Sequence, residues 1–541
     1  MIGQEPGGFR LLLLGLAVLM PAIWLDTSLT GSDEYNIAFR TALETSASDD
    51  WTVPTLAGAP RLQKPPLYYW VLSSSAHWFG SSPFSMRIWG VLAGALLAIV
   101  TATLGKRCCG ANPTLTFLIL ISTVGLATES RRAMLDVPMA FLTICSMERL
   151  YRWKTSGGTG TAVMAGLLLA IATLIKPTAL LFGFAGALSL FIAGPQRVPA
   201  ARLRELAVGI FTLLVVATPW WFLVADRYPQ LFEQIWQEQV ARREISWLHV
   251  EAIPSLLGGL LGLILPWSIV AIAALFTFLK KKSTGLETPE RWLVIWVILS
   301  AIPFLFMKTF ERYLIPVLPV LAILVSSHLE ALDERARRRH LLIATLLIGI
   351  PCLLISGFVG WFSCSLIAAA IIVGAWLVML LVSFDGSPTS SALAGAVLLA
   401  VVMGIALPAV GIGAIPRFPP ACQDSPRAII GGQFLGTLPL REGQWIPTLA
   451  TDPQTLAASL PKDKTTLILK DDAFGALEEA LIIAGRDARK VATFGTLRSR
   501  KTFVRFSRHD VTAEDWQDAF RKRSLAPLLI PCSIFVLEES P

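Results

Sequence analysis

Two adjacent carboxylates, Asp33 and Glu34, stand in the turn-like segment GSDEYN, directly after an apolar run. A carboxylate in this position can deprotonate an acceptor hydroxyl or hold a cation. The pair is therefore a candidate catalytic base. On position alone, two solvated loop acids explain the pattern equally well.

A second segment joins cations to aromatic rings. Arg61 and Lys64 precede PPLYYW, so two prolines restrict the chain beside the lysine. A lysine ammonium acts as a point charge for phosphate, and the aromatic rings suit an isoprenoid tail. The segment predicts a binding place for a lipid phosphate. The alternative is an interfacial lysine that reaches toward the phosphates of the bilayer.

A third segment, RRAMLDVP, places Arg131 and Arg132 at the end of an apolar run and Asp136 about one turn inside the next. A charge within a membrane span is costly and indicates function by default. A structural alternative is that Asp136 pairs with Arg132 at the i, i+4 spacing of a helix and fixes that helix.

Further charged residues occur beside other apolar runs. They are Lys176 in LIKPT, the group Lys308, Glu311, Arg312 and Tyr313, and the group Glu238, Arg242 and Arg243. Each alone fits an interfacial charge. A patch of cations beside carboxylates, however, is what a lipid-phosphate leaving group and an attacking hydroxyl require together.

The elements that position these residues are apolar. The chain has 541 residues, of which 54% are hydrophobic and 16% charged, and its mean hydropathy is +0.62. Soluble domains carry roughly 25% charged residues, which excludes a soluble enzyme. We expect about thirteen spans, near residues 11–25, 86–104, 113–128, 133–147, 161–175, 178–193, 206–225, 253–278, 290–307, 313–329, 341–358, 361–383 and 391–413.

The basic residues predict the orientation of these spans. With a cytoplasmic N-terminus, the Lys and Arg clusters fall on inside loops, and all the candidate residues converge on the outer face. The net charge of +8 is spread over these short clusters, so nucleic acid is a poor partner. Two outer loops, at about 26–85 and 226–252, are much longer than helix connections require. Stretches 35–45 and 66–79 of the first are amphipathic and are expected to lie flat on the membrane.

The segment after about residue 415 changes character and is expected outside. TTLILK, KVATFG and KTFVRFS predict strands, and DDAFGALEEALIIAG predicts a helix. This composition indicates a small α/β domain. Its cysteines, Cys422 and Cys532, form a disulfide or stay as buried thiols.

Metal binding has weaker support. The five histidines, at 77, 249, 328, 340 and 509, include no pair at ligand spacing, so a divalent ion would depend on carboxylates such as Asp33 and Glu34. No GxxxxGK[ST] loop is present, so direct use of ATP is not supported.

Several short motifs occur in a characteristic order: DE after the first span, SDDWTVPTLAGAPRLQKPPLYYW, LDVPMAF, LIKPTAL, PWW, LPW and RYLIPVLPVLA. In this order they resemble the polyprenyl-phosphate-sugar glycosyltransferases of the GT-C fold. The nearest group comprises the bacterial transferases that place aminoarabinose on lipid A, which are related to protein O-mannosyltransferases.

The resemblance implies a fold and a localisation. The fold class is a polytopic α-helical membrane protein of GT-C type, with a catalytic transmembrane domain at 1–414 and a periplasmic α/β domain at 415–541. The implied location is the bacterial inner membrane, with the active site on the periplasmic side.

The resemblance also implies roles for single residues. Asp33 matches the family's catalytic carboxylate, Lys64 a phosphate-contacting lysine, and Arg242 or Arg243 a phosphate-binding arginine. Tyr313 matches a tyrosine near that phosphate, and Asp136 an aspartate that supports the first loop or the sugar pocket.

Two positions depart from the aminoarabinose group, which has Glu before the KP and His in the second long loop. This chain has Gln63 and Gln239 there. Both family residues help to hold a divalent ion, so the departures weaken the metal site and the aminoarabinose assignment.

The expected function is transfer of a sugar, with inversion, from a polyprenyl-phosphate donor to lipid A or another cell-surface glycan. Alternatives are a protein O-glycosyltransferase of the same fold, a lipid-linked sugar flippase, and a scaffold with a decayed site. The sequence lacks the internal symmetry that many transporters show.

Overall fold

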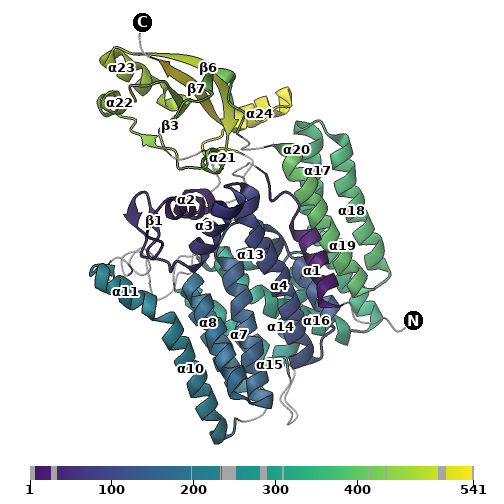
Figure 1. Cartoon of the computed structure of the whole chain (residues 1–541). Coiled ribbons are helices and arrows are strands. Elements are labelled where there is room, and N and C mark those ends of the chain that lie inside the picture. Colours follow the sequence, from purple (N-terminus) through teal and green to yellow (C-terminus); the bar gives the residue numbers. More distant parts are fainter. Residues whose placement is uncertain are drawn as a thin grey trace.

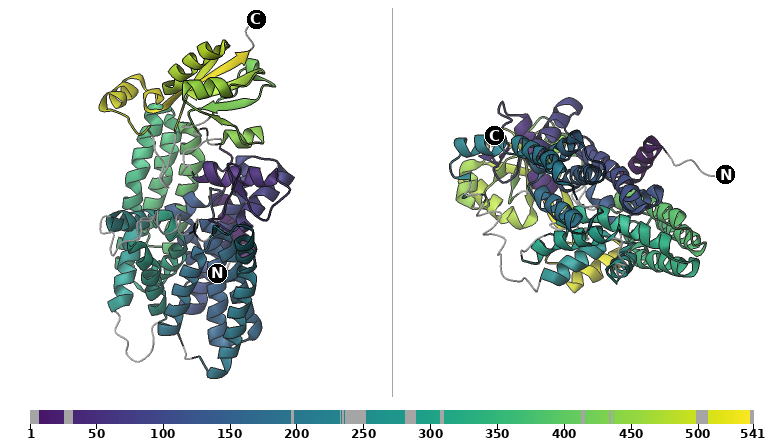
Figure 2. Two further views of the ribbon diagram at one scale, coloured as in Figure 1. Left: turned by 90° about the vertical axis from the view of Figure 1, so that its left-hand side faces the viewer. Right: turned by 90° about the horizontal axis from the view of Figure 1, so that it is seen from below.

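The computed structural model is a helical bundle with a β-sheet unit above one end (Figures 1 and 2). It describes residues 7–25, 33–195, 198–231, 233, 235, 252–280, 289–306, 310–411, 415–432, 435, 437–497 and 507–538. The N-terminal helix lies in the bundle, and the chain ends at the far side of the sheet unit.

The apolar runs form the bundle helices. These are α1 (Gly8–Leu19), α4 (Pro83–Cys109), α5 (Pro113–Ile121), α6 (Val124–Glu129), α7 (Asp136–Ser156), α8 (Thr159–Ile175), α9 (Thr178–Ala193), α10 (Leu203–Ala217), α11 (Pro219–Arg227), α13 (Ala252–Leu263), α14 (Ser268–Lys280), α15 (Arg291–Ala301), α16 (Leu318–Ala331), α17 (Glu334–Phe362), α18 (Leu366–Phe384), α19 (Pro388–Val401) and α20 (Leu407–Val410). Short turns are η2 (Ala200–Arg202), η4 (Ile302–Leu305), η5 (Glu311–Val317) and η6 (Val402–Ala406).

Among the described helices, six are long and apolar enough to cross a membrane. A seventh span results if the pair 256–263 and 268–280, bent by 107°, counts as one. Four apolar helices are shorter, including α1, α8 and α9. A multi-pass membrane protein is therefore confirmed, whereas the expected total of about thirteen spans is not.

Local residues explain where several helices begin and end. Ser82 caps α4 by a reciprocal hydrogen-bonded box with Ser85, and Gly110 ends that helix with a φ of 68°. The expected span 113–128 divides into α5 and α6 because the hydroxyls of Ser122 and Thr123 donate back to carbonyls of the preceding turn.

The first helix is shorter than expected. The run 11–25 predicts one span, but α1 ends at Leu19 and the chain turns at Met20 to Trp24. Pro21 lacks an N–H group and cannot continue the helical ladder, and Ala22 adopts a φ of 68°.

The first long loop is folded. It contains a π-helical turn, η1 (Glu34–Phe39), then α2 (Arg40–Ser46), a hairpin of β1 (Thr55–Leu56) and β2 (Ala59–Pro60), and α3 (Leu67–Phe79). The two amphipathic stretches are therefore helices, and they lie between the bundle and the sheet unit (Figure 1). Most of the second long loop, 226–252, lies outside the described residues.

The C-terminal unit carries a five-stranded sheet in the order β4-β3-β5-β7-β6. Its elements are η7 (Pro420–Cys422), β3 (Arg427–Ile430), α21 (Leu438–Glu442), β4 (Thr448–Leu449), α22 (Pro453–Ser459), β5 (Thr465–Lys470), η8 (Asp471–Ala473), α23 (Phe474–Ala484), β6 (Asp487–Thr496), α24 (Ala513–Lys522), η9 (Ala526–Leu528) and β7 (Ile530–Glu538).

In that sheet, β3 pairs in parallel with β4 and β5, whereas β7 runs antiparallel to β5 and β6. The strand expected at TTLILK coincides with β5, but most of KTFVRFS lies outside the described residues. Cys422 and Cys532 are both free and buried, so they form no disulfide with each other in this structure.

The sheet unit contacts the first loop. The guanidinium group of Arg40, at the start of α2, lies 4.4 Å from the ring centroid of Trp445, three residues after α21. This cation–π contact connects the loop that follows Asp33 to the C-terminal unit.

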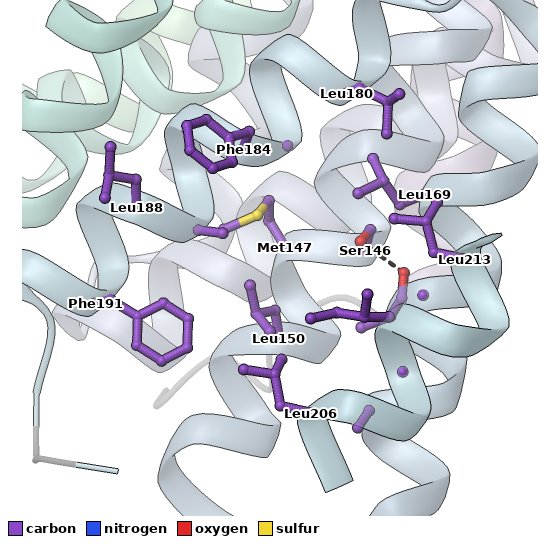
Figure 3. A pocket seen from close by; sticks show the side chains of 17 residues that line it. Ser146, Met147, Leu150, Leu169, Leu180, Phe184, Leu188, Phe191, Leu206 and Leu213 are labelled. Carbon is purple, nitrogen blue, oxygen red and sulfur yellow. Dashed lines mark hydrogen bonds between the residues drawn. The ribbon is translucent and has the colours of Figure 1, made fainter. Parts of the chain in front are cut away.

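A cavity of about 640 Å³ lies between α7, α8, α9 and α10 (Figure 3). Its lining is apolar, with Leu150, Phe184 and Leu206 among the side chains, and the Ser146 hydroxyl is occupied by a hydrogen bond to the Ala165 carbonyl. No titratable side chain lines it. Such a cavity suits hydrocarbon, so the ionic chemistry has to be located elsewhere.

Candidate functional site

A smaller, polar cavity of about 100 Å³ collects the residues that the sequence singled out. The predicted residues on its wall are Asp33, Arg61, Lys64, Asp136, Lys176, Arg312 and Tyr313, together with Tyr69 and apolar neighbours. They come from the start of η1, the segment after β2, the start of α7, the end of α8, and η5. Separate parts of the chain therefore build one site.

Asp33 directly precedes the π-helical turn η1 and contacts Arg312. The guanidinium Nη2 of Arg312 donates a hydrogen bond to Oδ2 of Asp33. The Asp33 side chain is 33% exposed, whereas that of Arg312 is 7% exposed. The carboxylate is thus reachable from outside while its cationic partner is fixed within the protein.

Asp136 is the most enclosed acid of the cavity and is held by two cations. Nζ of Lys176 lies 2.6 Å from its Oδ1, and Nε of Arg312 lies 3.9 Å from its Oδ2. The same Lys176 ammonium stands 3.7 Å from the ring centroid of Tyr313. Buried charges require partners of this kind, so the contacts fix these four side chains relative to one another.

The cavity carries more positive than negative charge. Its four cations are Arg61, Lys64, Lys176 and Arg312, and its two carboxylates are Asp33 and Asp136, which leaves a formal excess of two positive charges. Such an excess beside an accessible carboxylate suits an anionic leaving group such as a phosphate.

A hairpin sets the position of Arg61. The turn between β1 and β2 holds Ala57 and Gly58 at φ values of 59° and 72°. The Glu44 carboxylate accepts hydrogen bonds from both backbone N–H groups, at 2.9 and 3.1 Å, and from Arg40 at 2.6 Å. Burial raises the pKa of Glu44, but these hydrogen bonds outweigh it and leave the pKa below its usual value.

Arg61 itself extends from the end of this hairpin toward α3. Its Nε donates a hydrogen bond to the hydroxyl of Tyr69 at 3.1 Å, and its backbone N–H donates to the Pro54 carbonyl. Lys64 follows three residues later, before the two prolines that lead into α3. The hairpin and α3 therefore bring both cations to the same cavity.

Glu34 is buried and is not among the residues that line the cavity, and its expected catalytic role stays a prediction. Its carboxylate accepts two hydrogen bonds from Arg87, both at 2.9 Å, and one from the Ala133 N–H at 2.8 Å. Arg87 also donates to the carbonyls of Ile23 and Leu25. Glu34 thus joins the end of the first helix, α4 and the turn before α7 around Asp33.

Arg131 and Arg132 are likewise not among the residues that line the cavity. Arg131 donates to the carbonyls of Val18, Pro21 and Ala127, and Arg132 forms a buried ion pair with Glu129 at 2.8 Å. The alternative pairing of Arg132 with Asp136 is wrong. Helical spacing does not apply to it because α7 begins only at Asp136.

Four predicted site residues lie outside the described residues, so their contacts stay untested. They are Lys308, Glu238, Arg242 and Arg243.

The residues of this cavity do not fit a divalent metal ion. Within the described ranges, no three His, Cys, Asp or Glu side chains gather as ligands. Asp33 and Asp136 already contact Arg312 and Lys176, whose positive charges oppose a metal ion. Gln63 offers a neutral amide, and Gln239 lies outside the described residues.

Sequence reasoning missed the partners that hold the site. Arg87, Glu44 and Glu129 were not singled out, although each makes charged contacts next to a predicted residue or segment. For Glu129 the i, i+3 spacing to Arg132 was a usable signal. Nothing in the spacing of Arg87, 53 positions from Glu34, indicates their pairing.

The fold fits a polytopic membrane protein of GT-C type. ArnT from Cupriavidus metallidurans, in a crystal structure bound to undecaprenyl phosphate, matches with a TM-score of 0.65 and 20% identity over 92% of this chain and 97% of that chain. The family model described as dolichyl-phosphate-mannose-protein mannosyltransferase matches residues 35–233. The GT-C, ArnT-like resemblance expected from the motifs is confirmed.

Relatives in sequence agree with this structural match. An undecaprenyl phosphate-alpha-4-amino-4-deoxy-L-arabinose arabinosyl transferase of Pseudomonas aeruginosa (strain UCBPP-PA14) is 27% identical over 307 residues, 53% of each chain. A protein of Aquifex aeolicus (strain VF5) is 26% identical over 294 residues, 52% of this chain and 56% of its own length. The chain thus spans about half the length of the curated relatives it matches.

Proposed function

We propose that this protein is a membrane glycosyltransferase that transfers a sugar from a polyprenyl-phosphate donor, such as undecaprenyl phosphate, to an acceptor hydroxyl. The observation that carries the proposal is the single cavity in which an accessible carboxylate, Asp33, faces an excess of cations. The names of the sequence relatives and of the solved ArnT complex support the donor class.

In the proposed reaction, Asp33 accepts the proton of the acceptor hydroxyl. The hydroxyl oxygen forms a bond to the anomeric carbon while the bond from that carbon to the phosphate oxygen breaks. The electron pair of the broken bond stays on the polyprenyl phosphate. In-line attack of this kind inverts the anomeric configuration, and a positioned base of this type contributes about 10²- to 10⁴-fold in rate.

The cations of the cavity stabilise the negative charge that develops on the leaving phosphate. Arg61 and Lys64 approach from the first loop, whereas Arg312 approaches from η5. Because Arg312 contacts Asp33, a bound phosphate competes for this guanidinium and frees the carboxylate to accept a proton. Donor binding and activation of the base are thereby coupled.

The supporting cations serve mainly to hold the cavity in shape. Lys176 neutralises Asp136 and packs over Tyr313, so both the start of α7 and η5 keep their positions when the donor leaves. Preorganised charges stabilise a transition state more than charges that have to rearrange.

The acceptor is proposed to be lipid A or another cell-surface glycan. A protein acceptor is the second candidate, favoured by the match of residues 35–233 to the protein mannosyltransferase family model. In both cases we place the protein in the bacterial inner membrane, with about thirteen spans and with the cavity and the C-terminal unit on the periplasmic side.

The test is transfer by the purified full chain in detergent from a panel of radiolabelled polyprenyl-phosphate sugars. Lipid A, whole-cell glycan and a hydroxyl-rich peptide serve as acceptors, beside Asp33→Asn and the matched exposed variant Asp49→Asn. We expect transfer to be lost in D33N and kept in D49N. Polyprenyl phosphate binding without donor consumption by the wild type would favour a flippase or scaffold instead.

A further inference from the structure

A second polar cavity, of about 230 Å³, lies in the C-terminal unit and has no part in the chemistry described above. Three arginines line it, Arg417, Arg427 and Arg441, together with Phe418 and Glu442. We refer to these five residues as the arginine pocket.

Two of the guanidinium groups are held in place by the backbone. Nη1 of Arg427 donates hydrogen bonds to the carbonyls of Cys422 and Ser425, at 2.8 and 2.9 Å. Nη1 of Arg441 donates to the carbonyls of Ile415 and Pro416. Fixed donors of this kind lose little side-chain freedom when a ligand binds.

An aromatic ring stabilises the same two groups. The guanidinium carbons of Arg427 and Arg441 lie 4.5 and 5.0 Å from the ring centroid of Phe418. Phe418 in turn packs against the buried core of the sheet unit. The cations are therefore built into the fold instead of extending freely from the surface.

The charge of the pocket favours an anion. Three arginines and one carboxylate, Glu442, are among the residues that line it, and Glu442 lies 3.2 Å from Nε of Arg427. Arg417 is exposed and makes no hydrogen bond or ion pair with any described residue. Planar guanidinium groups that surround one cavity match the tetrahedral oxygens of a phosphate group.

Short chain segments connect the pocket to a candidate span and to a contact with the first loop. Arg417 follows the candidate span 388–410 by seven residues, so chain reach keeps it within about 25 Å of the end of that span. Trp445, three residues beyond Glu442, contacts Arg40 of the loop that also carries Asp33. A lipid headgroup bound here would lie next to the part of the C-terminal unit that contacts the first loop.

We propose that the arginine pocket binds a phosphate group of the lipid acceptor and so orients the acceptor toward Asp33. The identity of the lipid in this inference rests on the proposed function. The binding of a phosphate group does not. The phosphate could come from the acceptor or from bulk bilayer lipid, and the experiment below separates these sources.

The test measures binding of radiolabelled lipid A to the full chain in phosphatidylcholine nanodiscs. All variants carry Asp33→Asn, so that no turnover occurs. Arg417→Glu is the test variant because this side chain supports no described contact. Arg489→Glu, an exposed arginine on β6 of the same unit, is the matched control with the same change in charge. Enzymatically dephosphorylated lipid A and phosphatidic acid are the comparison probes.

We expect R417E to weaken lipid A binding about tenfold or more and R489E to leave it unchanged. Dephosphorylated lipid A should bind equally weakly to R417E and to the parent protein. Equal binding by R417E and the parent, or equal loss in R489E, would overturn the proposal. Displacement by phosphatidic acid as potent as by lipid A would assign the pocket to bulk lipid and overturn the acceptor role.

The two proposals fail in different ways. In one outcome, lipid A binding depends on phosphate and on Arg417, but the wild type transfers no sugar. This result would overturn the proposed function and support the arginine pocket. Transfer to lipid A with the same acceptor KM in R417E and the wild type keeps the function and overturns the pocket.

Discussion

The guanidinium group of Arg312 donates a hydrogen bond to the carboxylate of Asp33, a residue 279 positions earlier in the chain. The same guanidinium lies 3.9 Å from Asp136. Arg312 is therefore the one side chain in the described cavity that contacts both of its carboxylates, and it connects the accessible acid to the buried one.

Replacing Arg312 by Met should lower kcat about 10²- to 10³-fold, because a cation that faces the leaving phosphate is lost. Arg312→Lys should recover only part of this, since an ammonium cannot contact both carboxylates in the same fork geometry. Steady-state transfer kinetics measure the effect. Arg335→Met, which removes an exposed arginine at the start of α17, is the control and should keep the wild-type kcat. Unchanged kcat in R312M would remove Arg312 from the mechanism.

Lys176→Met should destabilise the protein by about 3–5 kcal/mol, because buried Asp136 would lose its nearest cation at 2.6 Å and keep Arg312 at 3.9 Å. The double variant Asp136→Asn with Lys176→Met should regain most of this stability. Thermal unfolding of the purified protein in detergent reports both. Lys280→Met, on the exposed end of α14, controls for loss of a lysine. A K176M protein as stable as the wild type would show that the pair is not structural.

Gly90→Ala should reduce both stability and transfer. A Cβ at Gly90 of α4 would stand 2.6 Å from the Ser130 carbonyl oxygen and 2.8 Å from that of Arg132, so the turn before Asp136 would have to move. Overpacking of this kind costs about 1–3 kcal/mol. Gly374→Ala in α18 is the matched control, because a Cβ there meets nothing within 4 Å. Equal melting temperatures for the two variants would contradict the expected strain.

The hairpin that carries Arg61 should open in acid. The pKa of Glu44 is lower in the folded protein than its usual value of 4.5, so its stabilising contribution is complete above about pH 4.5. That contribution is lost as the pH falls through the lower folded value. The protection factors of the Ala57 and Gly58 amides, which correct for the slower intrinsic exchange in acid, should therefore fall below pH 4.5 in the wild type.

Glu44→Gln provides the comparison for that experiment. In this variant, the amides of Ala57 and Gly58 should exchange faster than in the wild type at pH 7. The difference between the two proteins should shrink toward pH 3. Identical pH profiles for the wild type and the variant would show that the carboxylate does not hold the turn.

The sequence predicted the helices well where apolar runs have clear ends. Residues 178–193 were expected as one span, and α9 covers the same residues because Pro177 precedes it and Gly194 follows it. The prediction of one span over residues 11–25 is too long, because α1 ends at Leu19. Hydropathy counts Pro21 and Ala22 as apolar but ignores the backbone conformations that end the helix.

For the cavity, residue type was more informative than spacing. The sequence predicts that the charged residues beside the apolar runs converge, and one cavity contains Asp33, Lys64, Asp136 and Lys176. A charge at the end of an apolar helix needs water or a charged partner, so such residues gather at the same polar place. The pairing between them was not predictable. Lys176 and Asp136 are 40 positions apart in the sequence, and only tertiary packing brings them together.

The contact between Arg40 and Trp445 joins the first loop to a part of the chain that is made 405 residues later. Synthesis runs from the N-terminus, so the loop that carries Asp33 reaches its side of the membrane before Trp445 exists. Until translation passes α21, the Arg40 guanidinium therefore lacks its aromatic partner. A nascent chain that stops within the last spans has the first loop but not the contact that joins this loop to the C-terminal unit.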